Sequence, residues 1–148
     1  MASYNRLFYH FIWTTKNREP IILPEFESEL HSLIAGKVIE LGGIVHAVGG
    51  TDDHIHLAAT VPPKIAVARF IGEVKGNSSH AINHVVKPHY NFYWQTEYGV
   101  LSFAEKNLAT IVHYIHGQKQ HHAMGTINLA MEKQARKNSP QGFACEHG

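Results

Sequence analysis

Two histidines in the segment Thr51–Val61 have the residue types and the spacing from which a chemical site can be built. His54 and His56 alternate with the apolar residues Ile55 and Leu57, and the alternation continues to the end of the segment. A period of two predicts a β-strand, so both imidazoles leave it on the same side, about 7 Å apart along the backbone. Two ring nitrogens placed in this way can converge on one divalent cation. A cation held there could bind a phosphate and polarise it.

A His-x-His pair is a weak signal by itself, because such pairs also arise by chance on strands. It gains weight from a second segment that carries a tyrosine and a glutamine. Apolar residues recur at helical spacing between Ala104 and Ile115, and Tyr114 and Gln118 lie one helical turn apart on the flank of that stripe. Taken singly, Tyr114 could equally be a tyrosine at the edge of the core, and Gln118 a polar residue on the surface.

The elements that must position these residues follow from the hydrophobic pattern and its breakers. The first half of the chain predicts a strand, a helix that starts at a proline and stops at two glycines, a second strand, a turn, and the histidine strand. In order these are Arg6–Thr15, Pro24 to Gly42-Gly43, Ile44–Val48, Gly49–Asp53, and the strand from His54 to the break at Pro62-Pro63.

The second half predicts two more helices with a short hairpin between them. A long helix should carry apolar residues from Val67 to Val85 and end before Pro88, and an aromatic hairpin should pair Phe92–Gln95 with Val100–Ser102. Ser102 and Glu105 have the spacing of a capping box, which would start the tyrosine helix, and Gly125 would end it.

This order of elements predicts an α+β fold, namely a ferredoxin-like or RRM-like (RNA-recognition-like) antiparallel sheet with helices packed on one face. The C-terminal helix that carries Tyr114 adds to this layer. We expect one domain over residues 1–125, followed over 126–148 by a short helix and a loose tail.

Composition sets outer bounds on function. The 148 residues suit a single domain, and 44% hydrophobic with 17% charged residues is typical of a globular protein. The formal net charge of +1 does not by itself indicate nucleic acid, so a nucleic-acid binder would need local basic patches. One cysteine, no signal peptide and no apolar run of membrane-spanning length favour a cytoplasmic protein.

Local positive charge is found at several points that could contact phosphate. Lys16 and Arg18 close the first predicted strand, and a solvated strand end is about as good an interpretation of them as a phosphate contact. Lys75, in the Gly- and Ser-containing middle of the second long helix, and Lys119, next to Gln118, are further possible contacts. The aromatic residues at 92–94 could stack on unpaired bases, although such residues are more often core.

Together these motifs resemble the HUH transposases with a single tyrosine, of the insertion sequence 200/605 type, in which two histidines flank a bulky apolar residue. The similarity covers most of the chain, from about Tyr9 to His122. It is carried by His54-Ile55-His56 and Tyr114-Ile115-His116-Gly117-Gln118, and further by Tyr9–Arg18, Glu40–Val48, Val74-Lys75-Gly76, Trp94-Gln95 and Tyr98-Gly99.

The resemblance implies a metal-dependent strand transferase that acts on single-stranded DNA. His54, His56 and Gln118 would hold Mg²⁺ or Mn²⁺, although imidazole ligands alone would suggest a transition metal such as Zn²⁺. Tyr114 would attack the scissile phosphate and form a 5′-phosphotyrosine, so that no nucleotide cofactor is needed. The resemblance also implies a prokaryotic homodimer that recognises DNA hairpins at the ends of its element. Each active site would be shared, with the histidines from one chain and Tyr114 from the other.

Two related interpretations compete with this one. A replication-type HUH nickase shares the histidines and the tyrosine, but usually has lysine where this chain has Gln118. A domesticated DNA-binding protein could keep the fold without the activity, which the retention of His54, His56, Tyr114 and Gln118 argues against. A plain RNA-recognition module is disfavoured, since no Gly-Phe-x-Phe pattern lies on a predicted strand.

Overall fold

A computed structural model of the protein describes residues 5–120. A four-stranded antiparallel sheet forms its centre, in the order β2-β3-β1-β4. The strands are β1 (Phe8–Thr14), β2 (Ile44–Gly50), β3 (His54–Thr60) and β4 (Gly99–Phe103). The helices are α1 (Pro24–Glu40), α2 (Val67–Ala81) and α3 (Leu108–His116). Within the described range, no helix is both long and apolar enough to cross a membrane.

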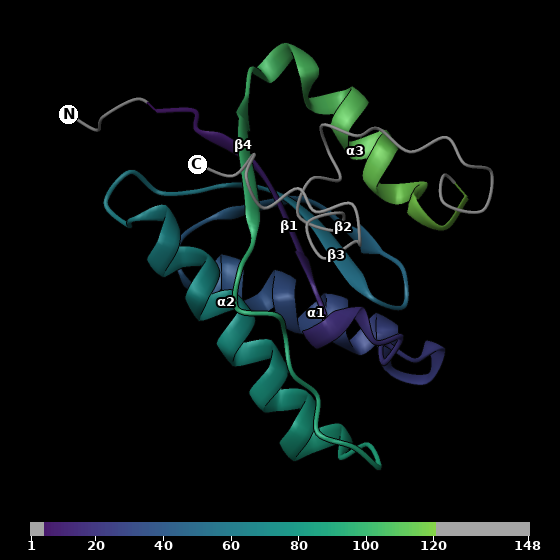
Figure 1. The fold of residues 1–148 in the computed structure, drawn as a ribbon. Coiled ribbons are helices and arrows are strands. Elements are labelled where there is room, and N and C mark those ends of the chain that lie inside the picture. Colours follow the sequence, from purple (N-terminus) through teal and green to yellow (C-terminus); the bar gives the residue numbers. More distant parts are fainter. Residues whose placement is uncertain (1–4, 121–148) are drawn as a thin grey trace.

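Helices α1 and α2 cover one face of the sheet, and α3 crosses the other (Figure 1). Alternation along β3 assigns its residues to the two faces. Ile55, Leu57 and Ala59 are buried in the large core with residues of α1 and α2. Ala58 belongs to a smaller cluster on the other face with Ala47 and two isoleucines of α3, Ile111 and Ile115. The predicted ferredoxin-like layer is therefore confirmed, with the tyrosine helix on the face opposite the two packing helices.

Strand register determines which residues lie beside the histidines. In the antiparallel ladder of β1 and β3, Thr14 lies opposite His54 and Ile12 opposite His56. On the other side of β3, Gly49 of β2 lies opposite His56. Directly opposed residues point to the same face of a sheet, so this set forms the surface onto which α3 packs. The predicted turn at Gly49–Asp53 is shorter than expected, because Gly49 and Gly50 extend β2.

The predicted aromatic hairpin is wrong. Gly99–Phe103 pairs with β1, whereas the first predicted arm meets the end of β1 through a single bridge between Trp94 and Thr15. Two contacts explain the difference. Phe92 is fully buried in the large core, and the Lys75 ammonium group binds three consecutive carbonyl oxygens that follow Trp94. Both hold this segment against α2 and away from β4.

The predicted capping box is also wrong. Ser102 lies inside β4, paired with Tyr9, so its backbone belongs to the sheet. A short 3₁₀ turn over Glu105–Asn107 precedes α3, and the Glu105 carboxylate forms an ion pair with Arg6. Helix α2 ends at Ala81, and a π-helical turn over Ile82–Val86 follows it directly. Together the two span the long second helix that the sequence predicts. The predicted helix end at Gly125 and the predicted elements of residues 126–148 lie outside the described residues.

Candidate active site

The four residues predicted to do chemistry lie together between β3 and the end of α3. His54, His56 and Gln118 are 1%, 0% and 1% exposed, and Tyr114 is 7% exposed. The rings of His54 and His56 are 5.2 Å apart, and the Tyr114 ring meets the His56 ring edge-on at 5.9 Å between centroids. All four belong to one chain. The shared site predicted from the sequence would require α3 to leave this position for the equivalent one on a second chain.

Gln118 reaches the histidines because the helix is interrupted just before it. Helix α3 ends at His116 with Gly117 as its C-cap, so the predicted single helix through Tyr114 and Gln118 is wrong in this detail. The Gln118 amide nitrogen lies 3.5 Å from the Tyr114 carbonyl oxygen, and its Oε1 lies 3.1 Å from Nε2 of His54. The side chain thus bridges from the tyrosine helix to the histidine strand.

A glycine allows α3 to come this close. A Cβ atom added at Gly49 would lie 2.4 Å from the carbonyl oxygen of Ile115 and 3.0 Å from its side chain. No residue with a side chain fits there without a backbone shift. Ile115 is the neighbour of Tyr114, so the absence of a side chain at position 49 determines where the tyrosine lies. The sequence interpretation treated this glycine only as part of a turn.

His54 is oriented by a carboxylate that the sequence interpretation missed. Its Nδ1 lies 2.7 Å from Oδ1 of Asp53 and 2.9 Å from the hydroxyl of Thr51. Burial raises the pKa of Asp53, but the His54 hydrogen bond and the nearby Arg18 outweigh it, so the pKa is lowered overall and the carboxylate stays ionised. The usable signal was the Thr-x-Asp-His sequence, in which an acid stands next to a candidate ligand.

His56 also has an oriented ring, through a histidine on the neighbouring strand. His10 of β1 is 3% exposed, and its Nε2 lies 2.8 Å from Nδ1 of His56. Because one of two bonded imidazoles must donate the proton and the other accept it, this contact couples their tautomers. The alternation of His10 with Tyr9 and Phe11 in the first predicted strand was the available signal for a third histidine on one face of the sheet.

The donor set is chemically suited to a cation. If the proton on His54 Nδ1 is donated to Asp53, then Nε2 presents a lone pair, and it faces the carbonyl-type oxygen of Gln118 at 3.1 Å. Two lone pairs at this distance repel unless a positive charge lies between them. Two ligands at about 2.1 Å from one ion and at right angles are about 3 Å apart, as in octahedral magnesium sites. Among residues 5–120, no three His, Cys, Asp or Glu side chains form a metal-binding group, and Gln118 is the side chain that could add a third ligand to His54 and His56.

The four lysine and arginine residues predicted to contact DNA are not gathered at one place. Lys119 pairs with Glu27 at 2.5 Å, beside Gln118. Arg18 lies 3.4 Å from the Asp53 carboxylate, and Lys16 lies over the Tyr93 ring. These three border the histidine site or the segment next to it.

Lys75 has a different place. It is buried on α2, across the sheet from the histidines, and its ammonium group donates to the carbonyls of Gln95, Thr96 and Glu97 at 2.7, 3.1 and 3.0 Å. Burial lowers its pKa to about 8, so the group is still mostly protonated at neutral pH. A phosphate contact by Lys75 would require these hydrogen bonds to break. In this structure Lys75 holds the segment after Trp94 in place.

Comparisons with known proteins bear on the family of the chain. A family model described as "Transposase IS200 like" matches residues 3–118. The ISDra2 transposase TnpA of Deinococcus radiodurans is 27% identical over 119 residues, which are 76% of this chain and 84% of that protein.

Two solved structures have the same fold. A crystal structure of a candidate transposase from D. radiodurans R1 has a TM-score of 0.62 and 27% identity, and the match covers 80% of this chain and 95% of that one. A REP-associated tyrosine transposase bound to a REP hairpin has a TM-score of 0.60, and the match covers 86% of this chain and 76% of that one. At 19% identity, this second likeness bears on the fold alone. Since the family model spans both the histidine strand and the tyrosine helix, the chain belongs to the IS200-like transposases.

Proposed function

We propose that this transposase cleaves and rejoins single-stranded DNA at the ends of its element, with Tyr114 as the nucleophile. The observation that carries the proposal is the contact between the Tyr114 ring and the buried histidine pair, with Gln118 linking the two elements. The Tyr114 ring thus lies beside the two imidazoles and the amide that could hold a cation next to the reacting phosphate.

The metal is part of the proposal. His54, His56 and Gln118 would hold Mg²⁺ or Mn²⁺, which would supply positive charge to the scissile phosphate and to the phenolate. Asp53 and His10 would act on the ligands, since each contacts the Nδ1 atom of one histidine. An oriented ring loses less freedom when it binds an ion, and a carboxylate partner raises the basicity of the opposite nitrogen.

The proposed chemical step exchanges one phosphodiester bond for another. The Tyr114 oxygen, once its proton is lost, attacks phosphorus, and the bond to the 3′ oxygen of the neighbouring nucleotide breaks. That oxygen takes up a proton and becomes a free 3′-OH, while the 5′ phosphate remains on the tyrosine. Attack by a 3′-OH on the phosphotyrosine reverses the step and releases Tyr114, so the number of phosphodiester bonds is conserved without a nucleotide cofactor.

The DNA substrate is proposed to be a hairpin-forming single strand. Support comes from the solved relative that is described as bound to a REP hairpin. It also comes from Arg18 and Lys119, cationic side chains at the border of the site. A homodimer is proposed as well, with each site either complete in one chain or assembled from two.

The direct test is a search for a covalent adduct. The protein is incubated with Mg²⁺ and single-stranded oligonucleotides from the ends of its element, and the adduct is mapped by peptide mass. We expect it on Tyr114, and none with Tyr114→Phe, which removes only the hydroxyl. Tyr9→Phe removes a hydroxyl from a tyrosine packed against the large core, on the face of the sheet away from the histidines, and is the matched control. An adduct on another tyrosine, or normal cleavage by Tyr114→Phe, would refute the proposal.

A further inference from the structure

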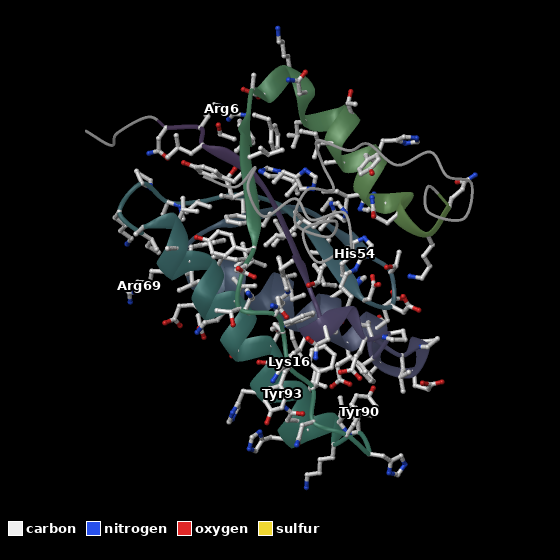
Figure 2. The ribbon with its side chains drawn as sticks, viewed as in Figure 1. Arg6, Lys16, His54, Arg69, Tyr90 and Tyr93 are labelled. Atoms are coloured by element: carbon white, nitrogen blue, oxygen red, sulfur yellow. The ribbon has the colours of Figure 1, made fainter. Side chains whose placement is uncertain are left out.

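A surface outside the histidine site has the features of a second contact point for DNA. It centres on Tyr93, which is 51% exposed although most aromatic side chains of the described chain are packed. The amino group of Lys16 lies over the Tyr93 ring, 5.8 Å from its centroid. Figure 2 shows the two side chains together near the end of β1.

Tyr93 lines two cavities, one on each side of the segment 93–96. The smaller, of about 280 Å³, is also lined by Lys16 and Asn17. The larger, of about 410 Å³, lies between this segment and α2, where Gly72 and Gly76 form part of its wall. A volume of this size is typical of pockets that hold small organic groups. An exposed ring bordered by cavities and a cation is the arrangement on which unpaired bases stack.

Backbone and side-chain hydrogen bonds hold Tyr93 and Lys16, which together form the proposed stacking platform. Lys16 N donates to the Tyr93 carbonyl at 2.9 Å, and Asn17 N to the side-chain oxygen of Gln95 at 3.3 Å. Asn17 and Arg18 both have left-handed backbone angles, with φ of 57° and 54°. Such angles cost free energy in residues other than glycine, and they persist where neighbouring contacts over-determine them, often at ligand clamps. Beneath Tyr93, Lys75 fixes the carbonyls that follow Trp94.

A short series of contacts connects this platform to the histidine site. Asp53 binds His54 on one side and Arg18 on the other, and Lys16 is two residues from Arg18. Thr15, the residue before Lys16, donates its backbone N–H to the Asp53 carbonyl at 2.9 Å. A single DNA strand that leaves the histidine site past Arg18 and Lys16 would therefore arrive at Tyr93.

We propose that Tyr93 and the 410 Å³ cavity beside it bind one unpaired base of the single-stranded DNA, with Lys16 contacting the adjoining phosphate. This proposal rests on the function proposed above. It adds a second DNA-binding site, which is connected to His54 through Asp53 and Arg18. Stacking on an aromatic ring does not depend on the identity of the base, so the site should add affinity with little sequence preference.

Two glycines of α2 allow a test in which thermal stability and DNA affinity should change in opposite directions. A Cβ atom at Gly72 or Gly76 would meet nothing within 4 Å, so the fold itself does not require glycine there. Replacing a glycine inside a helix by a residue with a side chain ordinarily stabilises the helix. Gly76→Leu should therefore keep or raise the unfolding temperature while its side chain occupies the cavity and weakens DNA binding. Gly36→Leu, at an equally open helical glycine on α1, is the matched control and should leave binding unchanged.

The experiment uses full-length Tyr114→Phe protein, which cannot cleave, and single-stranded oligonucleotides with 2-aminopurine at successive positions. We expect one position to be quenched on binding, and the quenching to be lost with Tyr93→Ala but kept with Tyr93→Phe. Tyr93→Ala should weaken binding roughly 5- to 150-fold, the range for loss of one stacked base. Ile39→Ala, an exposed apolar residue outside the cavities, is the control.

Several outcomes would overturn the proposal. Unchanged affinity and quenching in Tyr93→Ala would do so, as would full binding by Gly76→Leu with its fold intact. If Tyr93→Ala fails to fold, Gly76→Leu still decides. These readouts do not depend on cleavage. A wild-type protein that forms no adduct refutes the proposed function, whereas normal cleavage with no effect at Tyr93 refutes only this binding site.

Discussion

Replacing Gly49 by alanine should disable the site while leaving most of the fold intact. The new Cβ would lie 2.4 Å from the Ile115 carbonyl oxygen, whereas ordinary contacts begin near 3.4 Å, so one of the two backbones must move by about 1 Å. Strand β2 is held along its length by β3, while α3 rests on a small apolar cluster. We therefore expect α3 to move and to carry Tyr114 away from His56.

The expected size of the effect follows from this displacement. Overpacking of this kind costs about 1–3 kcal/mol of stability, and a misplacement of about 1 Å at a reacting group can cost about 100-fold in rate. The assays are single-turnover cleavage of a single-stranded substrate and urea denaturation. Gly36→Ala, with open space around the new Cβ, is the matched control and should be stabilising by about 0.5–1 kcal/mol without affecting cleavage. Cleavage by Gly49→Ala within threefold of wild type would show that the packing of α3 does not position the tyrosine.

Further predictions concern the metal, the DNA and the assembly. Asp53→Asn should lower metal affinity by about 10- to 100-fold, because it removes the carboxylate that orients His54; His56→Ala should lower it further, and calorimetry measures both. Equal metal affinity of the wild type, Asp53→Asn and His56→Ala would contradict the assignment of the metal ligands. Affinity for single-stranded DNA should fall steeply with salt, and Lys16→Ala or Lys119→Ala should each reduce the log–log slope by about 0.7. Mixing His56→Ala with Tyr114→Phe chains should restore cleavage in roughly a quarter of sites if sites are shared between two chains; background cleavage would assign each site to one chain.

The order of strands and helices was predictable because hydrophobic periodicity reports local structure directly. The alternation around His54 and His56 correctly indicated a strand with both rings on one face, and Pro24 and Gly42 marked the ends of α1 to within two residues. Periodicity carries no information about long-range partners. For this reason the segment at 92–95 was assigned to a hairpin, when burial of Phe92 and the Lys75 contacts hold it against α2.

The residues of the candidate active site could be predicted from the sequence, but the residues that support them could not. His54, His56, Tyr114 and Gln118 belong to short motifs that can be recognised in the sequence, and the structure brings them together. His10 lies 46 positions before His56, and only the register of β1 against β3 brings it near. Gly49 acts through the absence of a side chain, which a sequence does not distinguish from an ordinary turn glycine. Asp53 could have been found, since it directly precedes His54.

The unequal cores on the two faces of the sheet divide the molecule into parts of different stability. Among the described residues, two alanines of the sheet and two isoleucines of α3 form the buried cluster on one face, whereas sixteen buried residues form the core on the other. Helix α3 should therefore open as a separate cooperative unit, with its amide protons exchanging while those of β1 and β3 stay protected. If two chains exchanged this helix, each sheet would regain the same contacts. The balance between the closed and the exchanged forms would then be governed by protein concentration and by the reach of the segment before α3.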